Sequence, residues 1–187
     1  MIQKEVDKSL YILNKKGLIL YPTDTVWGIG CDATSETAVQ KIYKLKRRND
    51  SKALICLVSD FEMLKNYISN IPEVVYDILN KAKKPTTIIY NNPKGLAKNL
   101  IAVDNTIAIR IPNHDFCQKL IKTLGKPIVS TSANISGEIT PKSFKEISAQ
   151  ILNDVDYIVN LSGSNLDTNP SKIIKLNSDG SITTIRE

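Results

Sequence analysis

Runs of strand-type and helix-type residues alternate along this chain, and that alternation restricts its fold more than any other feature. Residues 106–111 alternate as a strand does, with three isoleucines on one face. Residues 115–124 instead have helical spacing and end at Gly125. Strands that alternate with helices are typical of a layered α/β domain, in which helices cover a sheet. At 187 residues the chain fits one such domain over residues 1–187.

The same patterns predict the other elements. Thr34 or Ser35 caps a helix that ends near Lys46, and Ser143 with Glu146 forms a capping box for a later helix. Further strands are expected at 18–21, 53–58, 86–90, 126–131, 157–160, 172–176 and 181–186, and further helices at about 60–69 and 73–83.

The motif G-x-G-x-x-A at residues 28–33 lies in the wrong context for a dinucleotide site. That fingerprint needs its first glycine directly after a strand, and an acidic residue at the end of the next strand. Here PTDTVW separates Gly28 from the strand at 18–21, and no such acidic residue follows. We therefore expect these glycines to form a sharp turn.

The sequence lacks motifs for covalent or metal catalysis. It has no G-x-x-x-x-G-K-[ST] loop and no G-x-S-x-G elbow, and its single histidine, His114, is expected in a surface turn. Carboxylates do not cluster with metal-ligand spacing, so we expect no metal held by the protein itself. Cys31, Cys56 and Cys117 lie far apart, which favours reduced thiols, with Cys56 in the core.

The charge and the N-terminal segment restrict the environment of the chain. A net charge of +6 favours an anionic partner without saying which one. Residues 1–17 contain no uninterrupted apolar run long enough for a signal peptide or a membrane span. We therefore expect a cytoplasmic protein without a membrane partner.

Hydroxyl, amide and cationic residues gather in three short passages. These are PTDT at 22–25, KRR at 46–48 and STSAN at 130–134. Such groups bind oxyanions. Each passage taken alone has an ordinary explanation: a proline turn, cations favoured at a helix C-terminus, or a simple turn. Their wording and order along the chain make a functional explanation the better one.

Taken together, these passages resemble the YrdC family of threonylcarbamoyl-AMP synthases. The resemblance rests on LYPTDTVWGIGCDA at 20–33, KLKRRNDSKALI at 44–55, TIAIRIP at 106–112, KPIVSTSANISG at 126–137 and PSKII at 170–174. It covers the chain from residue 18 to its end. It implies an α/β fold with a twisted mixed β-sheet flanked by helices, as in the short, single-domain branch of that family.

The resemblance also implies roles for individual residues. The family's K-x-R and S-x-N signature implies four catalytic residues, Lys46, Arg48, Ser132 and Asn134. It implies an ATP side formed by Lys46, Arg48, Lys52, Thr106, Asn134 and Arg186. It implies a threonine side formed by Thr25, Arg110, Ser132 and Ser171.

The chain departs from the family pattern at four places. Arg47 stands where the family usually has glycine, and Ala53 where many members have proline. Leu57 stands where some members place a histidine against threonine. The usual P-G-P before the strand at 86–90 is replaced by Lys83-Lys84-Pro85. The local geometry at these places is therefore left open.

The reaction that the resemblance implies joins L-threonine, bicarbonate-derived carbon dioxide and ATP into threonylcarbamoyl-AMP and pyrophosphate, for the t6A modification of tRNA at position 37. The carbamate of threonine attacks the α-phosphate, so no protein nucleophile is needed, and Mg²⁺ is expected to arrive with ATP. The resemblance further implies a downstream threonylcarbamoyl transferase machinery, and it leaves open whether the chain itself binds tRNA or passes its product to partners that do.

Two other readings of the sequence remain. One is a non-catalytic RNA- or nucleotide-binding module of the same fold. The other is a flavin-pathway or hydrolase-associated domain of similar fold, which would lack the STSAN passage.

Overall fold

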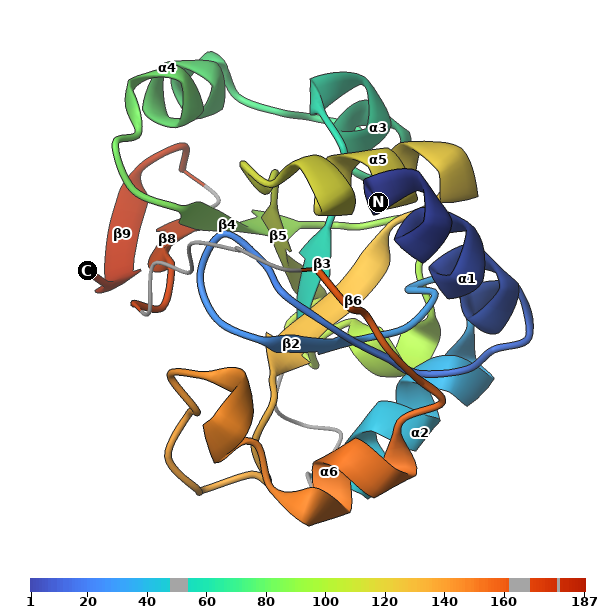
Figure 1. Ribbon diagram of the computed structural model, residues 1–187. Coiled ribbons are helices and arrows are strands. Elements are labelled where there is room, and N and C mark those ends of the chain that lie inside the picture. The colour runs from blue at the N-terminus through green and yellow to red at the C-terminus, as the bar shows by residue number, and fades with distance from the viewer. Residues whose placement is uncertain (48–53, 162–168, 178) are drawn as a thin grey trace.

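Nine strands form one sheet in the part of the chain that the structure, a computed structural model, describes: residues 1–47, 54–161, 169–177 and 179–187 (Figure 1). The strands are β1 (Ile19–Tyr21), β2 (Gly28–Gly30), β3 (Ile55–Leu57), β4 (Thr86–Asn91), β5 (Thr106–Arg110), β6 (Ile128–Ser132), β7 (Tyr157–Ile158), β8 (Lys172–Leu176) and β9 (Ile182–Arg186). Their order across the sheet is β7-β1-β2-β6-β3-β5-β4-β8-β9.

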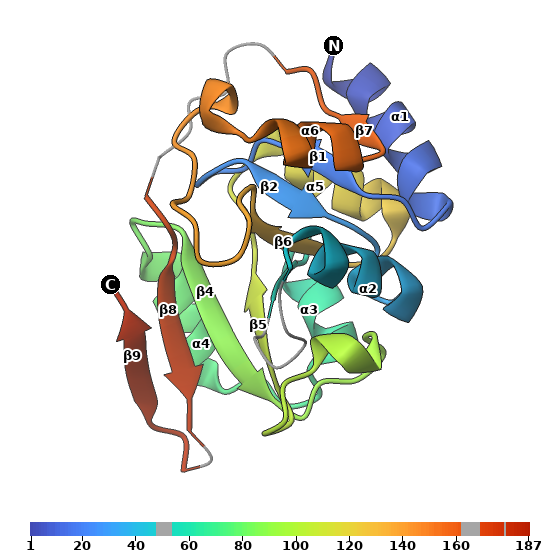
Figure 2. The same cartoon turned by 90° about the horizontal axis from the view of Figure 1, so that it is seen from below.

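The sheet is mixed, as the resemblance implies. The pairs β1 with β7, β3 with β5, and β4 with β8 are parallel. The other neighbouring pairs are antiparallel. Figure 2 shows β9, which ends next to the C-terminus, at one edge of the sheet. The mixed α/β fold expected from the sequence is therefore confirmed.

Helices flank this sheet on both faces. The α-helices are α1 (Ile2–Asn14), α2 (Glu36–Leu45), α3 (Phe61–Tyr67), α4 (Glu73–Lys81), α5 (Asp115–Leu124) and α6 (Ala149–Asp154), and the 3₁₀ turns are η1 (Lys98–Leu100) and η2 (Phe144–Glu146). Among the described residues, no helix has both the length and the apolar character needed to cross a membrane.

The helix ends follow the predicted capping residues. The Ser35 hydroxyl accepts a hydrogen bond from the N–H of Ala38 at 3.3 Å and begins α2. Gly125 ends α5 with a φ of 70°, which glycine adopts without steric cost. Because α2 ends at Leu45, Lys46 lies just beyond the helix, as predicted.

The helix expected after Ser143 is only a 3₁₀ turn, η2. The Ser143 hydroxyl hydrogen-bonds the Glu146 carboxylate at 3.0 Å, so the two side chains satisfy each other and make no side-chain cap on the turn. The α-helix starts later, at α6, where the Ser148 hydroxyl accepts from the N–H of Ile151 at 3.5 Å. The helix predicted from a Ser143–Glu146 capping box is therefore wrong, and the helix that does form is capped by Ser148.

The sharp turn predicted at Gly28 and Gly30 is wrong, because these residues form strand β2. A Cβ on Gly30 would lie 2.6 Å from the Val129 carbonyl oxygen and 2.7 Å from Tyr21 Cε1. The glycine is therefore required by close packing between strands, and its φ is not in the left-handed region. Helix α1 was not predicted at all.

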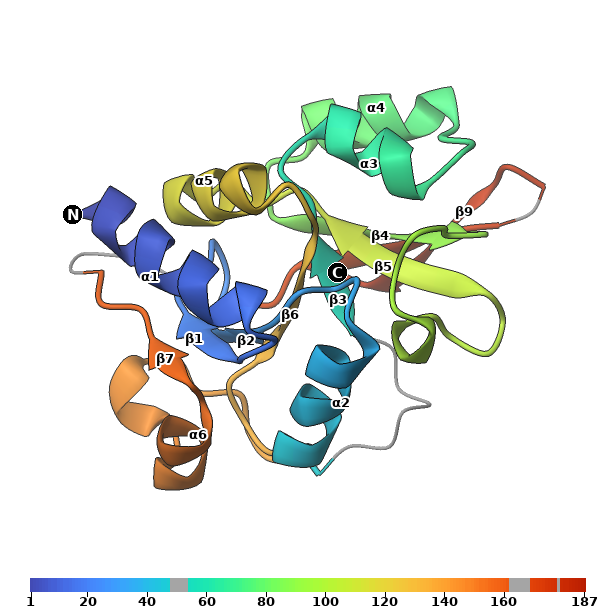
Figure 3. The same ribbon diagram turned by 90° about the vertical axis from the view of Figure 1, so that its right-hand side faces the viewer.

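Two core clusters lie on opposite faces of the sheet. Phe116 and Leu120 of α5 join Val6 and Leu13 of α1 around Leu57 of β3. The helix α2 lies on the other face (Figure 3), where its buried residues belong to a second cluster that includes Cys56, Ile88 and Ile109. The predicted core position of Cys56 is confirmed, and Cys31, Cys56 and Cys117 are all buried and free. Burial raises the pKa of each of these thiols.

The register of the strands places apolar and polar rows side by side on the face that α1 and α5 partly cover. Leu57, Arg110 and Thr87 are paired across β3, β5 and β4. Paired residues project to the same face of the sheet. Leu57 therefore packs against α5, and Arg110 and Thr87 lie beside it on the same face. A cavity lies over the part of this face that includes Arg110.

Candidate active site

A cavity of about 320 Å³ lies over the middle of the sheet. Its apolar floor includes four residues of neighbouring strands, Ile55, Ala108, Ile89 and Ile173. Its polar lining comes from loops and strand ends and includes Thr25, Arg110, Ser130, Ser132, Ser171 and Arg186. Hydroxyl groups and guanidinium groups therefore surround a mostly apolar floor, an arrangement that suits a small ligand with anionic groups.

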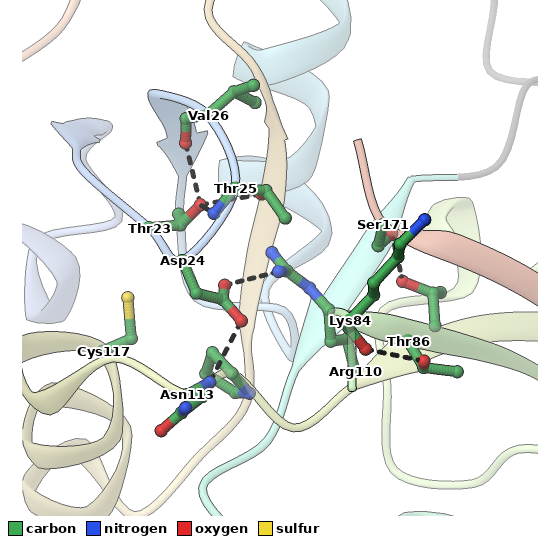
Figure 4. Close-up of polar contacts among 12 residues, drawn as sticks. Thr23, Asp24, Thr25, Val26, Lys84, Thr86, Arg110, Asn113, Cys117 and Ser171 are labelled. Carbon is green, nitrogen blue, oxygen red and sulfur yellow. Dashed lines mark hydrogen bonds and ion pairs between the residues drawn. The ribbon is translucent and has the colours of Figure 1, made fainter. Parts of the chain in front are cut away.

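Arg110 brings a buried positive charge into this cavity. Only 4% of the residue is exposed, and its guanidinium donates a hydrogen bond from Nη1 to the Asp24 carboxylate (Figure 4). Its Nε is buried and has no hydrogen-bond partner among the described residues. A buried donor without a partner is unfavourable, so Arg110 is prepared for an acceptor that a ligand supplies.

The passage PTDT forms a loop whose side chains bond to one another. The Thr23 hydroxyl accepts from the N–H of Thr25 at 3.1 Å and donates to the Val26 carbonyl at 2.8 Å. The hydroxyls of Thr23 and Thr25 lie 2.9 Å apart. These contacts hold Thr25 at the cavity wall, where the residue is only 4% exposed.

A second guanidinium approaches from the far side of the cavity. Arg186 of β9 donates from Nε and Nη2 to the Ser171 carbonyl at 2.9 and 2.7 Å. The Ser171 hydroxyl lies 2.7 Å from the Thr87 hydroxyl on β4. Burial and the charge of Arg110 lower the pKa of Arg186, and both residues line the same cavity. An anion between them would relieve the repulsion of their charges.

Lys46 lies behind Ser132 and binds the loop that follows β6. Its ammonium donates to the carbonyls of Ser132 and Asn134 at 2.5 and 2.6 Å and contacts Asn134 Oδ1 at 3.4 Å. The Ser132 hydroxyl donates to the same Oδ1 at 2.5 Å, and Asn134 Nδ2 donates to the Glu138 carbonyl at 2.7 Å. Lys46 is 1% exposed. The K-x-R lysine and the S-x-N residues therefore form one connected cluster.

The structure brings five of the predicted site residues to the cavity wall: Thr25, Arg110, Ser132, Ser171 and Arg186. Lys46 and Asn134 are in contact with Ser132 and lie directly behind it. Thr106 is not at the wall, because it begins β5 at the end opposite Arg110, and its hydroxyl donates to Asp104 at 2.6 Å. Arg48 and Lys52 lie outside the described residues.

Sequence reasoning missed three kinds of residue in this site. Asp24 was treated only as part of a turn, although its carboxylate binds Arg110. Thr87 was not singled out, although its hydroxyl meets Ser171. The apolar floor was also missed, because strand patterns do not tell which part of a sheet face helices leave uncovered. For Asp24 the only signal was its place between two threonines of the PTDT passage.

Three of the four departures from the family pattern lie in the described part of the chain. Arg47 has a φ of 50°, the left-handed conformation that favours the glycine usual in the family. Leu57 is fully buried beside Arg110, so the neighbouring position on that row is apolar. Lys83, Lys84 and Pro85 border a second cavity of about 420 Å³, next to Asp24 and His114. Ala53 lies outside the described residues.

His114 is less exposed than the surface turn predicted for it. It lies at the N-cap position of α5, and its Nδ1 is buried without a partner among the described residues. Burial lowers the pKa of the imidazole.

The cavity lining does not suit a metal ion. The described residues that line it include no carboxylate, histidine or cysteine. Mg²⁺ prefers carboxylate, phosphate and water oxygens. The described lining would therefore not hold Mg²⁺ by itself, and its chemistry is that of an oxyanion site.

Comparison with known proteins agrees with this geometry. The Sua5/YciO/YrdC family model, described as "Telomere recombination", matches residues 11–187. The threonylcarbamoyl-AMP synthase of Idiomarina loihiensis is 35% identical over 163 residues, which make up 86% of this chain and 87% of that protein.

Solved structures share the fold. Escherichia coli YciO has a TM-score of 0.85 at 26% identity, over 99% of this chain and 89% of YciO. A double variant of P. abyssi Sua5 has a TM-score of 0.84 at 26% identity, over 97% of this chain and 55% of Sua5. The chain thus spans about half the length of that Sua5.

Proposed function

The chain belongs to the Sua5/YciO/YrdC family, and we propose that the cavity over β3, β5, β4 and β8 is where it makes threonylcarbamoyl-AMP. Its function is threonylcarbamoyl-AMP synthesis, and it is an enzyme of the nucleotidyltransferase type. The cavity is assigned this role because two arginines, Arg110 and Arg186, line it together with several hydroxyl side chains.

Arg110 is the residue that binds the carboxylate of threonine. A guanidinium can donate two parallel hydrogen bonds to a carboxylate, and Arg110 has a buried Nε without a partner among the described residues. The hydroxyls of Thr25 and Ser171 are the groups at the wall that can bind the hydroxyl of threonine. The apolar residue Ala108 next to them can contact its methyl group.

Ser132 and Arg186 are the cavity groups that face the phosphates of ATP. The hydroxyl of Ser132 donates to Asn134 in the ligand-free protein, so it would turn its O–H from Asn134 to a phosphate oxygen when ATP binds. Lys46 and Asn134 act by holding Ser132, because their polar groups are bound within the loop. Contacts of Arg48, Lys52 and Thr106 with ATP stay predictions from the resemblance.

The reaction needs alignment and charge neutralisation more than a protein nucleophile. The amine of threonine adds to carbon dioxide derived from bicarbonate and loses a proton, which gives a carbamate. A carbamate oxygen then attacks the α-phosphorus of ATP, and pyrophosphate leaves. The carbamate and the triphosphate repel each other, so cations that hold both at contact distance supply much of the catalysis. Arg110 and Arg186 are placed for that task.

Mg²⁺ would arrive with ATP and would supply positive charge against the phosphates, and none of the described cavity-lining residues would be needed to hold it. The adenylate then passes to a threonylcarbamoyl transferase machinery that modifies tRNA.

Ligand-dependent melting separates this function from that of an RNA-binding module. ATP and threonine together, each at about 100 times its Kd, should stabilise the fold by at least about 2.7 kcal/mol, or roughly 5 °C in Tm. Arg110→Lys should reduce the contribution of threonine alone. Stabilisation by RNA with a steep salt dependence, and none by threonine, would instead indicate the binding module.

A further inference from the structure

We propose that Asp24 is a positioning residue, which fixes the guanidinium of Arg110 by one nitrogen so that its Nε edge stays free for a ligand. This inference deepens the proposed function and rests on Arg110 as the carboxylate-binding residue. Because the contacts of Asp24 exist in the ligand-free protein, its role can also be tested without substrate.

The carboxylate of Asp24 is held by two segments that are distant in sequence from its own loop. One oxygen accepts from Nη1 of Arg110 at the end of β5, and the other accepts from the N–H of Asn113 at 3.0 Å (Figure 4). The side chains of Arg110 and Asp24 are 4% and 8% exposed. Because both oxygens have partners, the carboxylate has one orientation toward the guanidinium.

The loop that carries Asp24 is itself fixed. Thr23, immediately before it, binds the N–H of Thr25 at 3.1 Å and the carbonyl of Val26 at 2.8 Å. These bonds close the loop around Asp24 without involving its side chain. Asp24 therefore projects toward Arg110 from a turn that is held by its own hydrogen bonds.

The contact of Asp24 decides which donors of Arg110 remain for a ligand. A guanidinium has five N–H groups in a planar fork, and two of its edges can receive a carboxylate side by side. With Asp24 on Nη1, the edge formed by Nε and Nη2 is left, and Nε has no partner among the described residues. That edge is suited to a two-bond contact with the carboxylate of threonine.

Asp24 does not share the cavity that Arg110 lines. It borders the second cavity, together with Asn113, His114 and the lysines 83 and 84. It thus lies behind the guanidinium and acts on the ligand only through Arg110. This placement explains why a carboxylate can lie close to an anion-binding site without occupying it.

Three variants test the role. Asp24→Ala removes both acceptors, whereas Asp24→Asn keeps the shape and one oxygen acceptor but loses the charge. Asp32→Asn is the matched control, because Asp32 is also buried and is paired with Lys126 at 2.9 Å, away from the cavity. Asp32→Asn is expected to leave the threonine requirement within about twofold of wild type.

In the ligand-free protein, the Nε–H resonance of Arg110 is measured by nitrogen–proton NMR and assigned with the Arg110→Lys variant. The proposal expects this resonance to move or broaden in both Asp24 variants and to stay in place in Asp32→Asn. An unchanged resonance in a folded Asp24→Asn protein would overturn the proposal, whether or not the chain is a synthase.

Steady-state kinetics give the second readout. Asp24→Ala should raise KM for threonine at least about tenfold while KM for ATP and kcat change less than about threefold, and Asp24→Asn should lie between it and wild type. If Asp24→Ala does not fold, the threonine KM of Asp24→Asn decides, with an increase of at least about threefold expected. Equal increases in both KM values would show a merely structural role. A wild-type protein without threonine-dependent turnover would refute the proposed function, while the NMR result would still decide the role of Asp24.

Discussion

The ammonium of Lys46 is buried among three oxygens of the strand end and loop at β6. Its positive charge binds that loop. Two of these contacts, to the carbonyls of Ser132 and Asn134, have the short distances of charge-assisted hydrogen bonds. These contacts give Lys46 a structural role at this loop, while its contact with the triphosphate stays a prediction from the resemblance.

Lys46→Ala should therefore reduce both stability and activity. It would leave the buried carbonyls of Ser132 and Asn134 without their charged donor, at a cost of about 1.5 to 3 kcal/mol in the free energy of unfolding. We expect kcat/KM to fall at least about tenfold as the loop carrying Ser132 loses its position. Urea unfolding and steady-state kinetics measure the two effects, with Lys41→Ala on the exposed side of α2 as control. Unchanged stability with a raised KM for ATP alone would place the ammonium on the triphosphate instead.

Arg110→Lys is the second test at the scale of single residues. Lysine keeps the charge but lacks the planar fork, so one of two parallel bonds to a carboxylate is lost. We expect the threonine requirement to rise by an amount equivalent to roughly 1.5 to 3 kcal/mol, with little change in KM for ATP. Unchanged threonine dependence in a folded variant would mean that Arg110 does no more than pair with Asp24.

The site residues could be predicted only where a motif carried them. Thr25, Ser132 and Ser171 lie at the cavity wall. They could be predicted because the passages that contain them match family motifs. Asp24 and Arg110 are 86 positions apart, and nothing local in either passage indicates that they meet. Such contacts depend on sheet order, which hydrophobic spacing does not specify.

At the scale of elements, the predictable parts were those with strong local signals. The helix α5 begins and ends where its spacing and Gly125 indicated. The strand β2 was missed because glycine is rare in strands, and the reason for Gly30 lies in its contact with Val129 and Tyr21. The helix α1 buries the polar residues Glu5 and Ser9 beside Val6 and Leu13, so its core-facing side is not marked by apolar residues alone.

The attachment of α1 to the sheet leads to a prediction about pH. Burial alone would raise the pKa of Glu5, but hydrogen bonds from Tyr157 and Asn160 and the charges of two lysines outweigh it and lower the pKa. A carboxyl group whose pKa is lower in the folded state stabilises the fold above its unfolded pKa of about 4.5 and loses that contribution as the pH falls.

Glu5→Gln should therefore destabilise the protein at pH 7 by about 1 kcal/mol or more. The difference from wild type should shrink between about pH 5 and pH 3. Urea unfolding at several pH values measures it, with Asp7→Asn, on the exposed side of the same helix, as the control variant. A destabilisation by Glu5→Gln that does not change with pH would show that the carboxylate charge contributes nothing at this contact.

At the scale of the whole molecule, the site exists because helices cover the sheet unevenly. The helices α1 and α5 pack over one part of a face, and the cavity occupies the part over β5, β4 and β8. Local pattern predicted an α/β fold and the family resemblance a mixed sheet, but the strand order and the uncovered area are seen only in the structure. The net charge of +6 agrees with a reaction between two anionic partners without identifying them.

The most direct test of the central claim is the release of pyrophosphate from ATP by the purified chain, measured with each substrate omitted in turn. The account predicts release, together with an adenylate of the mass of threonylcarbamoyl-AMP, only when threonine and bicarbonate are both present. It also predicts that Arg110→Lys restores part of its lost rate at high threonine concentration. Equal pyrophosphate release with threonine or bicarbonate left out would contradict the account.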